Sequence, residues 1–172
     1  MYLFLGGETT WALKAYEEFL KDKPEKHTHA YISLASCYAK YEAWDKAEET
    51  LKTALSRLPD KPWKIMNEAS VHNHWGDIAA EKGDTDKAKE EYKKAIELLP
   101  TSDQPYGKHL LPKKVKVIQA KLDLLDYQTL DLSKLKNGKF KGVALGYKDN
   151  ITVTVTIKDG RIDEIDVTHK ED

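Results

Sequence analysis

The stretch HWGDIAAEKGDTDKAKEEYKKAIELLP, residues 74–100, predicts two helices that pack closely against each other. Small residues recur at helical spacing where two backbones must approach, and large residues recur where a side chain must fill the space between them. Gly83 and Asp84 indicate a turn followed by a helix start, because glycine adopts a positive φ and aspartate caps free N–H groups. Pro100 ends the unit, since proline cannot donate a helical hydrogen bond. The small residues are Gly76, Ala79, Ala88 and Ala95, and the large ones are Trp75, Tyr92 and Leu98.

The same pattern occurs a second time, with each position 41 residues earlier, as Leu34 precedes Trp75. The matching residues are Leu34, Ala35, Tyr38, Ala47, Leu51, Ala54 and Pro59. A partial copy comes before it, with matches at Gly7, Ala12, Tyr16, Phe19 and Pro24. These recurring positions resemble the tetratricopeptide repeat family over most of residues 3–100. The resemblance implies helical hairpins stacked into a right-handed superhelix, within a chain that is α+β but mostly α.

The closing prolines predict one helix that is longer than its counterparts. Pro59 and Pro100 lie 41 residues apart, seven more than the usual repeat length of about 34. Seven residues add two helical turns, about 10 Å of rise, without rotating the buried face of a helix. We therefore expect a helix from Pro62 or Trp63 to Glu81 that projects at its start. Three apolar residues on the projection either cover the end of the repeat stack or form an exposed contact patch: Trp63, Ile65 and Met66.

Apolar residues at helical spacing place the other helices. We expect them over residues 10–20, 28–40 and 44–58, and over Lys113 to Leu125, where a last helix would cap the apolar side of the repeats. Met1 to Leu5 are predicted to be the last turn of a helix, so we expect the natural protein to continue upstream; a genuine short start is the alternative. The predicted domains are residues 1–126 for the repeats with their cap, 127–136 for a linker, and 137–172 for a small antiparallel β segment.

In the β segment the hydrophobic period changes from helical to alternating. Residues 151–157 alternate isoleucine or valine with threonine, which is typical of a half-buried strand. Asp159-Gly160 indicates a tight hairpin to a return strand through Ile162, Ile165 and Val167, with an irregular step between the first two. An earlier strand is predicted by Phe140, Val143 and Leu145. The apolar face of such a sheet needs a cover. Either the helix at 113–125 folds back over it, or a second copy of the chain forms a homodimer through it, which is the alternative we favour.

The glycines and strands of this segment also match a second pattern. It consists of GKFKG at 138–142, Gly146-Tyr147, ITVTVTIKDG at 151–160, Ile162, Ile165, Val167 and HKE at 169–171. These residues resemble the opening half of the FMN-binding domain family, which includes periplasmic electron-transfer subunits. The family's flavin-attachment signature, Ser/Thr-Gly-Ala-Thr, does not occur in the sequence. The expected cofactor of this chain is therefore none, with FMN reserved for a longer natural protein. The resemblance implies an extracytoplasmic location; without it, we expect a cytoplasmic one.

The composition and motifs of the chain limit the classes of function that it can have. The formal net charge is −1, and residues 127–172 hold 8 basic and 8 acidic residues, so nothing favours nucleic acid. The sequence contains no run of ~18 apolar residues, so we expect no membrane insertion. Cys37 is the single cysteine and is predicted to be a small buried hydrophobe. The sequence lacks the common nucleophile, zinc and phosphate-loop motifs, which predicts no enzyme. A metal site from His29 and His74 is the minor alternative to solvated histidines.

The concave face of a tetratricopeptide array is formed by the first helix of each repeat. By position, the predicted partner-binding groove consists of His29, Ile32, Ser36, Ser70, Asn73 and Asp77, with Ala39 and Ala80 beside them. These short, mixed side chains suit an extended peptide. Tetratricopeptide repeat grooves that hold a C-terminal carboxylate use Lys/Arg and Asn, whereas this sequence has Ile32, Ser36 and Asp77 at these positions. Because Asp77 would repel a carboxylate, we do not expect this ligand.

The sequence thus predicts a protein-interaction scaffold that binds a protein or peptide segment in this groove, without catalysis. The alternative is a fragment of an extracytoplasmic electron-transfer flavoprotein whose FMN-binding domain is incomplete here. A third hypothesis is a structural role in which the edge of the sheet pairs between chains.

Overall fold

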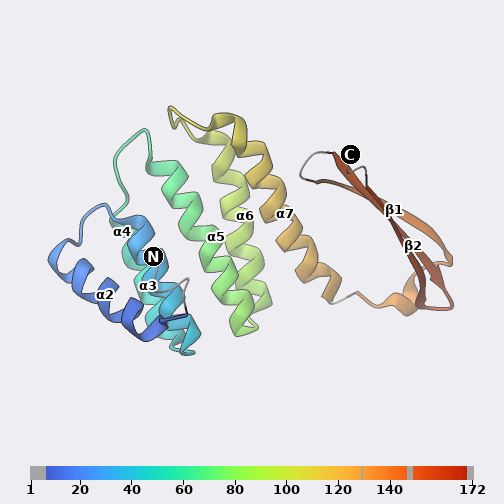
Figure 1. Cartoon of the computed structure of the whole chain (residues 1–172), viewed down its shortest axis with the longest axis horizontal. Helices are drawn as coiled ribbons and strands as arrows, with labels where there is room; N and C mark the ends of the chain where they lie inside the picture. Colours follow the sequence, from blue (N-terminus) through green and yellow to red (C-terminus); the bar gives the residue numbers. More distant parts are fainter. Residues whose placement is uncertain (1–6, 129, 147–148, 170–172) are drawn as a thin grey trace. The chain divides into compact units, whose positions relative to one another are not determined.

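A computed structural model describes residues 7–128, 130–146 and 149–169 of the chain (Figure 1). The chain divides into two compact units, residues 1–128 and residues 129–172. The first unit is helical and the second is a small sheet. The helices are α2 (Thr9–Asp22), α3 (Thr28–Lys40), α4 (Trp44–Ser56), α5 (Lys64–Lys82), α6 (Thr85–Leu98) and α7 (Leu111–Gln128), with short 3-10 turns at Leu99–Thr101 and Lys108–Leu110. The helix turn predicted for residues 1–5 lies outside the described residues.

The mostly helical fold with a small antiparallel sheet is confirmed, and the helices lie where the repeat pattern places them. α3 has the predicted bounds, and α5 has 19 residues against 13 for α3, so the insertion does lengthen this helix. α7 begins at Leu111, two residues earlier than expected, because Pro112 is tolerated in the first turn of a helix, where its missing N–H would have no partner.

Small residues form the contacts between the paired helices, as the pattern predicts. Ala47 and Ala54 of α4, and Ala88 and Ala95 of α6, are fully buried. They belong to two apolar clusters, one centred on α3 and α4 and one reaching from α5 and α6 to α7. The small methyl group of each alanine lets the two helix backbones approach closely. Large side chains from the partner helix then fill the space that remains.

Gly76 of α5 lies in close contact with the ring of Tyr92 of α6. A Cβ atom at Gly76 would lie 2.4 Å from Tyr92 Cδ1 and 2.5 Å from Cε1, so only glycine leaves room for the ring. Ala35 and Leu51 hold the corresponding positions of the preceding repeat, and both are fully buried. In that repeat the second helix has the smaller Leu51 in place of tyrosine, and the first helix has the larger Ala35 in place of glycine.

The turn between α5 and α6 has the predicted chemistry. Gly83 has a φ of +86° and ends α5 in the left-handed conformation, which glycine adopts without steric cost. The Asp84 side chain then caps α6 by accepting a hydrogen bond of 3.1 Å from the backbone N–H of Lys87.

α7 covers the open side of the last hairpin. Ile118, Leu122 and Leu125 are buried against α5 and α6 and the segment that follows α6, which confirms the predicted capping stripe. Val117, Leu124 and Tyr127 lie outside this buried stripe of α7, and each of them is more than half exposed.

The second unit is a three-stranded antiparallel sheet in the order β1 (Gly138–Leu145), β2 (Asn150–Lys158), β3 (Arg161–Thr168). Asp159 and Gly160 both have positive φ, 51° and 72°, and form the predicted two-residue turn. The register between β2 and β3 shifts after Thr156, so that Asp163 is an extra residue on β3 and accounts for the irregular step. A 3-10 turn at Leu132–Lys134 lies within the predicted linker.

One face of this sheet is apolar, and we call it the apolar sheet face. Its members follow from the alternation of β2 and from the residues paired with it on both neighbours. Ile157 is buried on this face, whereas Phe140 is 47%, Ile165 57% and Val167 52% exposed. Among the described residues of the sheet, these three large apolar side chains stay about half exposed, and the sequence predicts that such a face needs a cover. Its residues are Phe140, Ala144, Ile151, Val153, Val155, Ile157, Ile162, Ile165 and Val167.

Candidate functional site

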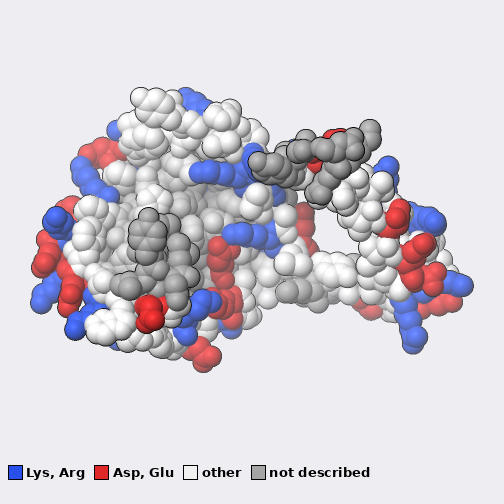
Figure 2. All heavy atoms as spheres, viewed as in Figure 1, with Lys and Arg blue, Asp and Glu red and all other residues white. Residues whose placement is uncertain are grey.

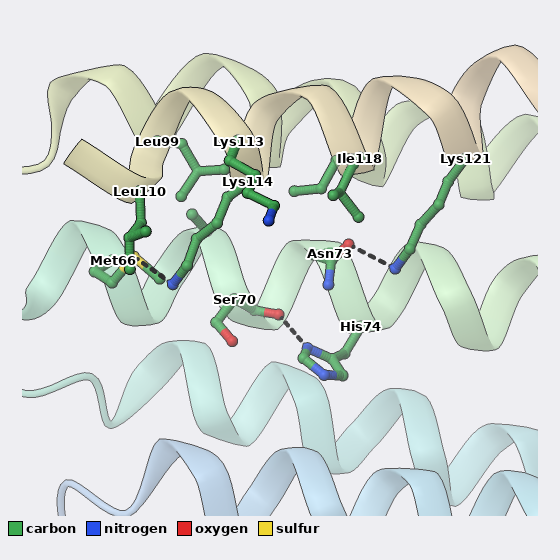
Figure 3. Close-up of a pocket in the computed structure, with 12 residues that line it drawn as sticks. Met66, Ser70, Asn73, His74, Leu99, Leu110, Lys113, Lys114, Ile118 and Lys121 are labelled. Atoms are coloured by element: carbon green, nitrogen blue, oxygen red, sulfur yellow. Dashed lines mark hydrogen bonds between the residues drawn. The ribbon is translucent and has the colours of Figure 1, made fainter. Parts of the chain in front are cut away.

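A hollow of about 400 Å³ lies between α5 and α7, and we call it the α5–α7 groove (Figure 3). Met66, Ala69, Leu99, Leu110, Val117 and Ile118 are its apolar residues. Ser70, Asn73, His74, Lys113, Lys114 and Lys121 are its polar ones. Leu99 and Ile118 are buried and form the base, whereas Leu110 and Val117 are about half exposed at the mouth.

A second hollow of about 350 Å³ adjoins the groove at the start of α5. The two share Met66, Ser70, Leu110 and Lys114, so they form one continuous depression. The second hollow adds His29, Trp63, Asn67, Gln104, Tyr106 and Gly107. From Trp63 to Asp77 the helix rises by roughly 20 Å, about the length of six residues of extended peptide.

Lys121 bridges the two walls at the far end of the groove. Its Nζ lies 2.6 Å from Asp77 Oδ1 and donates a 3.0 Å hydrogen bond to Asn73 Oδ1, both on α5. The Tyr92 hydroxyl donates a 2.7 Å hydrogen bond to the same Asp77 oxygen. Burial, together with the Asp77 carboxylate, raises the pKa of Tyr92, so the hydroxyl stays protonated and remains a donor. The negative charge of Asp77 is therefore compensated from two sides, and this offsets the repulsion of a carboxylate that the sequence suggests.

Lys113 and Lys114 carry positive charge that the described residues do not neutralise. Both are exposed at the rim, and Lys114 Nζ lies 3.9 Å from Met66 Sδ. In the described parts of the chain, no carboxylate lies within ion-pair distance of either lysine, and no Asp or Glu lines either hollow. Lys114 and Lys121 reach from α7 toward α5 across the groove (Figure 3). In the space-filling view, Lys side chains cross a largely uncharged surface here, while charges of both signs mix over α2 (Figure 2).

A sequence model described as a tetratricopeptide repeat-like domain matches residues 6–127. The chain belongs to this family. The Photosystem I assembly protein Ycf3 of Synechococcus sp. (strain CC9605) is 31% identical over 84 residues, which are 48% of this chain and 49% of that protein. The chain thus spans about half the length of this relative. The match to the tetratricopeptide repeat-like domain ends before the β segment, so the resemblance of residues 137–172 to FMN-binding domains stays a prediction.

Within the tetratricopeptide repeat-like domain, four of the predicted groove residues lie along the depression. His29 lines the second hollow, Ser70 lines both hollows, Asn73 lines the α5–α7 groove, and Asp77 follows it along α5 as the partner of Lys121. Two predicted groove residues lie elsewhere. The side chain of Ile32 is 5% exposed and packs in the first apolar cluster, and the Ser36 hydroxyl donates a 3.0 Å hydrogen bond to the Ile32 carbonyl.

The lysines of α7 were not among the predicted groove residues. The sequence predicts only a capping role for α7, whereas this helix also occupies the place of a first helix in a further repeat. A usable signal is present in the sequence, since Lys114 and Lys121 are seven residues apart and therefore lie on one side of a helix. The sequence predicts that Trp63 and Met66 either cover the end of the repeat stack or form a contact patch. Met66 packs against the second apolar cluster and lines both hollows, whereas Trp63 is 41% exposed at the edge.

The most buried ionic cluster of the helical unit lies between α5 and α6. Glu91 is 1% exposed, and its carboxylate lies 2.5 Å from His72 Nδ1, 2.7 Å from Lys87 Nζ and 3.1 Å from Lys94 Nζ. Burial alone would raise the pKa of Glu91, but hydrogen bonds from His72, Lys87 and Lys94 outweigh it and lower the pKa to about 2. Because an ionised carboxylate can only accept, His72 Nδ1 carries the proton of that bond. The cluster joins the two helices and lines neither hollow.

The described residues contain no group of three or more His, Cys, Asp or Glu side chains placed to hold a metal ion. His74 Nδ1 donates its hydrogen to the Ser70 carbonyl at 2.8 Å, because a carbonyl oxygen can only accept a hydrogen bond. Of the helices that the structure describes, none has the length and apolar character needed to cross a membrane.

Proposed function

We propose that this chain is a non-catalytic interaction scaffold that binds a segment of a partner protein in the depression along α5. The observation that carries the proposal is the continuous depression, which combines an apolar base with polar groups at its rim. Membership of the tetratricopeptide repeat-like family supports it, and so does the relative whose name describes an assembly protein.

The polar groups of the depression suit the backbone of an extended peptide. Asn73 uses its side-chain oxygen to accept from Lys121, and among the described residues its amide nitrogen has no partner, so it is available to a peptide carbonyl. The Ser70 hydroxyl lies between the two hollows and can donate or accept. These groups fix the direction of a bound segment without requiring one particular sequence.

An arrayed library of random octapeptides tests the proposal. We expect the purified chain to bind a subset of the peptides, and Ser70→Arg to abolish that binding by filling the junction of the two hollows. Ser56→Arg is the matched control, because Ser56 is exposed on α4 and lines neither hollow. Equal binding by the two variants, with both folded by circular dichroism, would place the partner site elsewhere.

A second proposal concerns the apolar sheet face, where we infer that a second copy of the chain provides the cover. The exposed fractions of Phe140, Ile165 and Val167 support it, since three neighbouring large apolar side chains at about half exposure favour association. A neutral apolar surface is also complementary to itself, as a two-fold interface requires. Sedimentation across micromolar concentrations tests this idea, and a monomer with an intact sheet contradicts it.

The electron-transfer alternative rests on the sequence resemblance of residues 137–172 to the opening half of FMN-binding domains. It differs from the scaffold in one simple property, because bound flavin absorbs visible light. We expect the purified chain to be colourless, and stoichiometric flavin in its absorbance spectrum would favour the alternative.

A further inference from the structure

We infer that the partner segment is acidic around an apolar anchor, and that the anchor enters the α5–α7 groove beside Lys113 and Lys114. This inference rests on the proposed function and adds the chemistry of the occupant. Three features of the groove carry it: its apolar base, its unpaired lysines and the absence of acidic lining residues in the described structure.

The base of the groove requires an apolar occupant. Leu99 and Ile118 close it from below, and Met66, Leu110 and Val117 surround the opening. The volume of about 400 Å³ falls in the range of binding pockets, roughly 300–1,000 Å³, and so accommodates one or two large side chains. Leu110 and Val117 stay about half exposed without an occupant, which is unfavourable for a chain alone in water.

The rim of the groove selects the charge of the occupant. Lys121 is already paired with Asp77, but Lys113 and Lys114 have no carboxylate partner among the described residues. A basic segment would be repelled, and a neutral one would desolvate two charges without compensation. A segment with carboxylates on either side of its anchor would pair with them. The excess of positive charge is local, since the formal net charge of the chain is −1.

Defined peptides test this inference through fluorescence anisotropy. The main probe is a fluorescein-labelled octapeptide with Leu-Phe at its centre and three Glu on each side. Matched probes replace all Glu by Gln, all Glu by Lys, or Leu-Phe by Ser-Ser. We expect the Glu probe to bind at least about tenfold more tightly than the Lys probe, and its affinity to fall as salt is raised. We expect the Ser-Ser probe to bind weakly, because it leaves the base unfilled.

Charge reversal on α7 locates the effect. The double variant Lys113→Glu with Lys114→Glu should reverse the preference, so that the Lys probe binds more tightly than the Glu probe. Lys116→Glu is the matched control, because Lys116 is exposed on the same helix and lines neither hollow. It should leave the preference unchanged. Circular dichroism checks that each variant is folded.

The outcomes separate this inference from the proposed function. Equal binding of the Glu, Gln and Lys probes, or no change of preference in the double variant, would overturn the acidic partner. Tight binding of the Ser-Ser probe would overturn the apolar anchor, and failure of the Glu probe to bind would overturn both. The proposed function fails separately, when Ser70→Arg leaves binding of the random octapeptides intact.

Discussion

Gly76 and Tyr92 make a close contact within the hairpin of α5 and α6, and Gly76→Ala tests how much this contact contributes to stability. An added Cβ would lie 2.4 Å from the Tyr92 ring, whereas carbon atoms in contact are normally about 3.5–4.0 Å apart. The ring cannot simply turn away, because Tyr92 is 3% exposed and its hydroxyl is bonded to Asp77 at 2.7 Å. The ring or the α6 backbone must therefore move by about 1 Å.

Two opposing effects set the change in the free energy of unfolding that Gly76→Ala causes. Overpacking of this kind costs about 1–3 kcal/mol, and the fixed ring places the cost toward the upper end. Alanine is favoured over glycine inside a helix by about 0.8–1.0 kcal/mol. We expect a net loss of about 1–2 kcal/mol in the free energy of unfolding, which urea titration followed by far-UV circular dichroism resolves.

A double-mutant cycle separates the clash from the helix preference. The preceding repeat has Ala35 and Leu51 at the matching positions, so Tyr92→Leu should make room for alanine at position 76. In that background we expect Gly76→Ala to stabilise the chain by about 1 kcal/mol, giving a coupling of about 2–3 kcal/mol between the sites. The reasoning is refuted if Gly76→Ala stabilises the chain in both backgrounds, or if the coupling is near zero.

Three further predictions concern other parts of the chain. Ala88→Leu should overpack α5 against α6 and lower the free energy of unfolding by about 1–3 kcal/mol, spreading to the neighbouring repeats; exposed Ala120→Leu should change it little. The folded-state pKa of Glu91 is about 2, below its ordinary 4.5, so its contribution of about 3 kcal/mol is present above pH 4.5 and lost as the pH falls toward 2. Urea titrations across this range should show the loss in the wild type and in Glu97→Gln, but not in Glu91→Gln. Val155→Lys should shift the predicted dimer to monomer in sedimentation, and Thr154→Lys, on the other sheet face, should not.

The order and length of the elements could be predicted from the sequence because they depend on local chemistry. The Gly83 turn, the capping stripe of α7 and the Asp159-Gly160 hairpin follow from spacings within a few residues. The long α5 follows from the repeat length, because Pro59 and Pro100 lie 41 residues apart. Part of the candidate site could be predicted from the repeat pattern, since Ser70 and Asn73 follow from their position in the repeat and line the depression.

The tertiary structure decided how those elements combine into a surface. Ile32 has a groove position by repeat numbering, yet it is buried, because its exposure depends on helices packed around α3. Asp77 alone suggests a site that repels carboxylates, but Lys121, 44 positions later in the chain, neutralises it. Periodicity identifies which face of a helix is buried, whereas the charge of a groove is the sum over side chains brought together by packing. Local spacing carries no information about that sum.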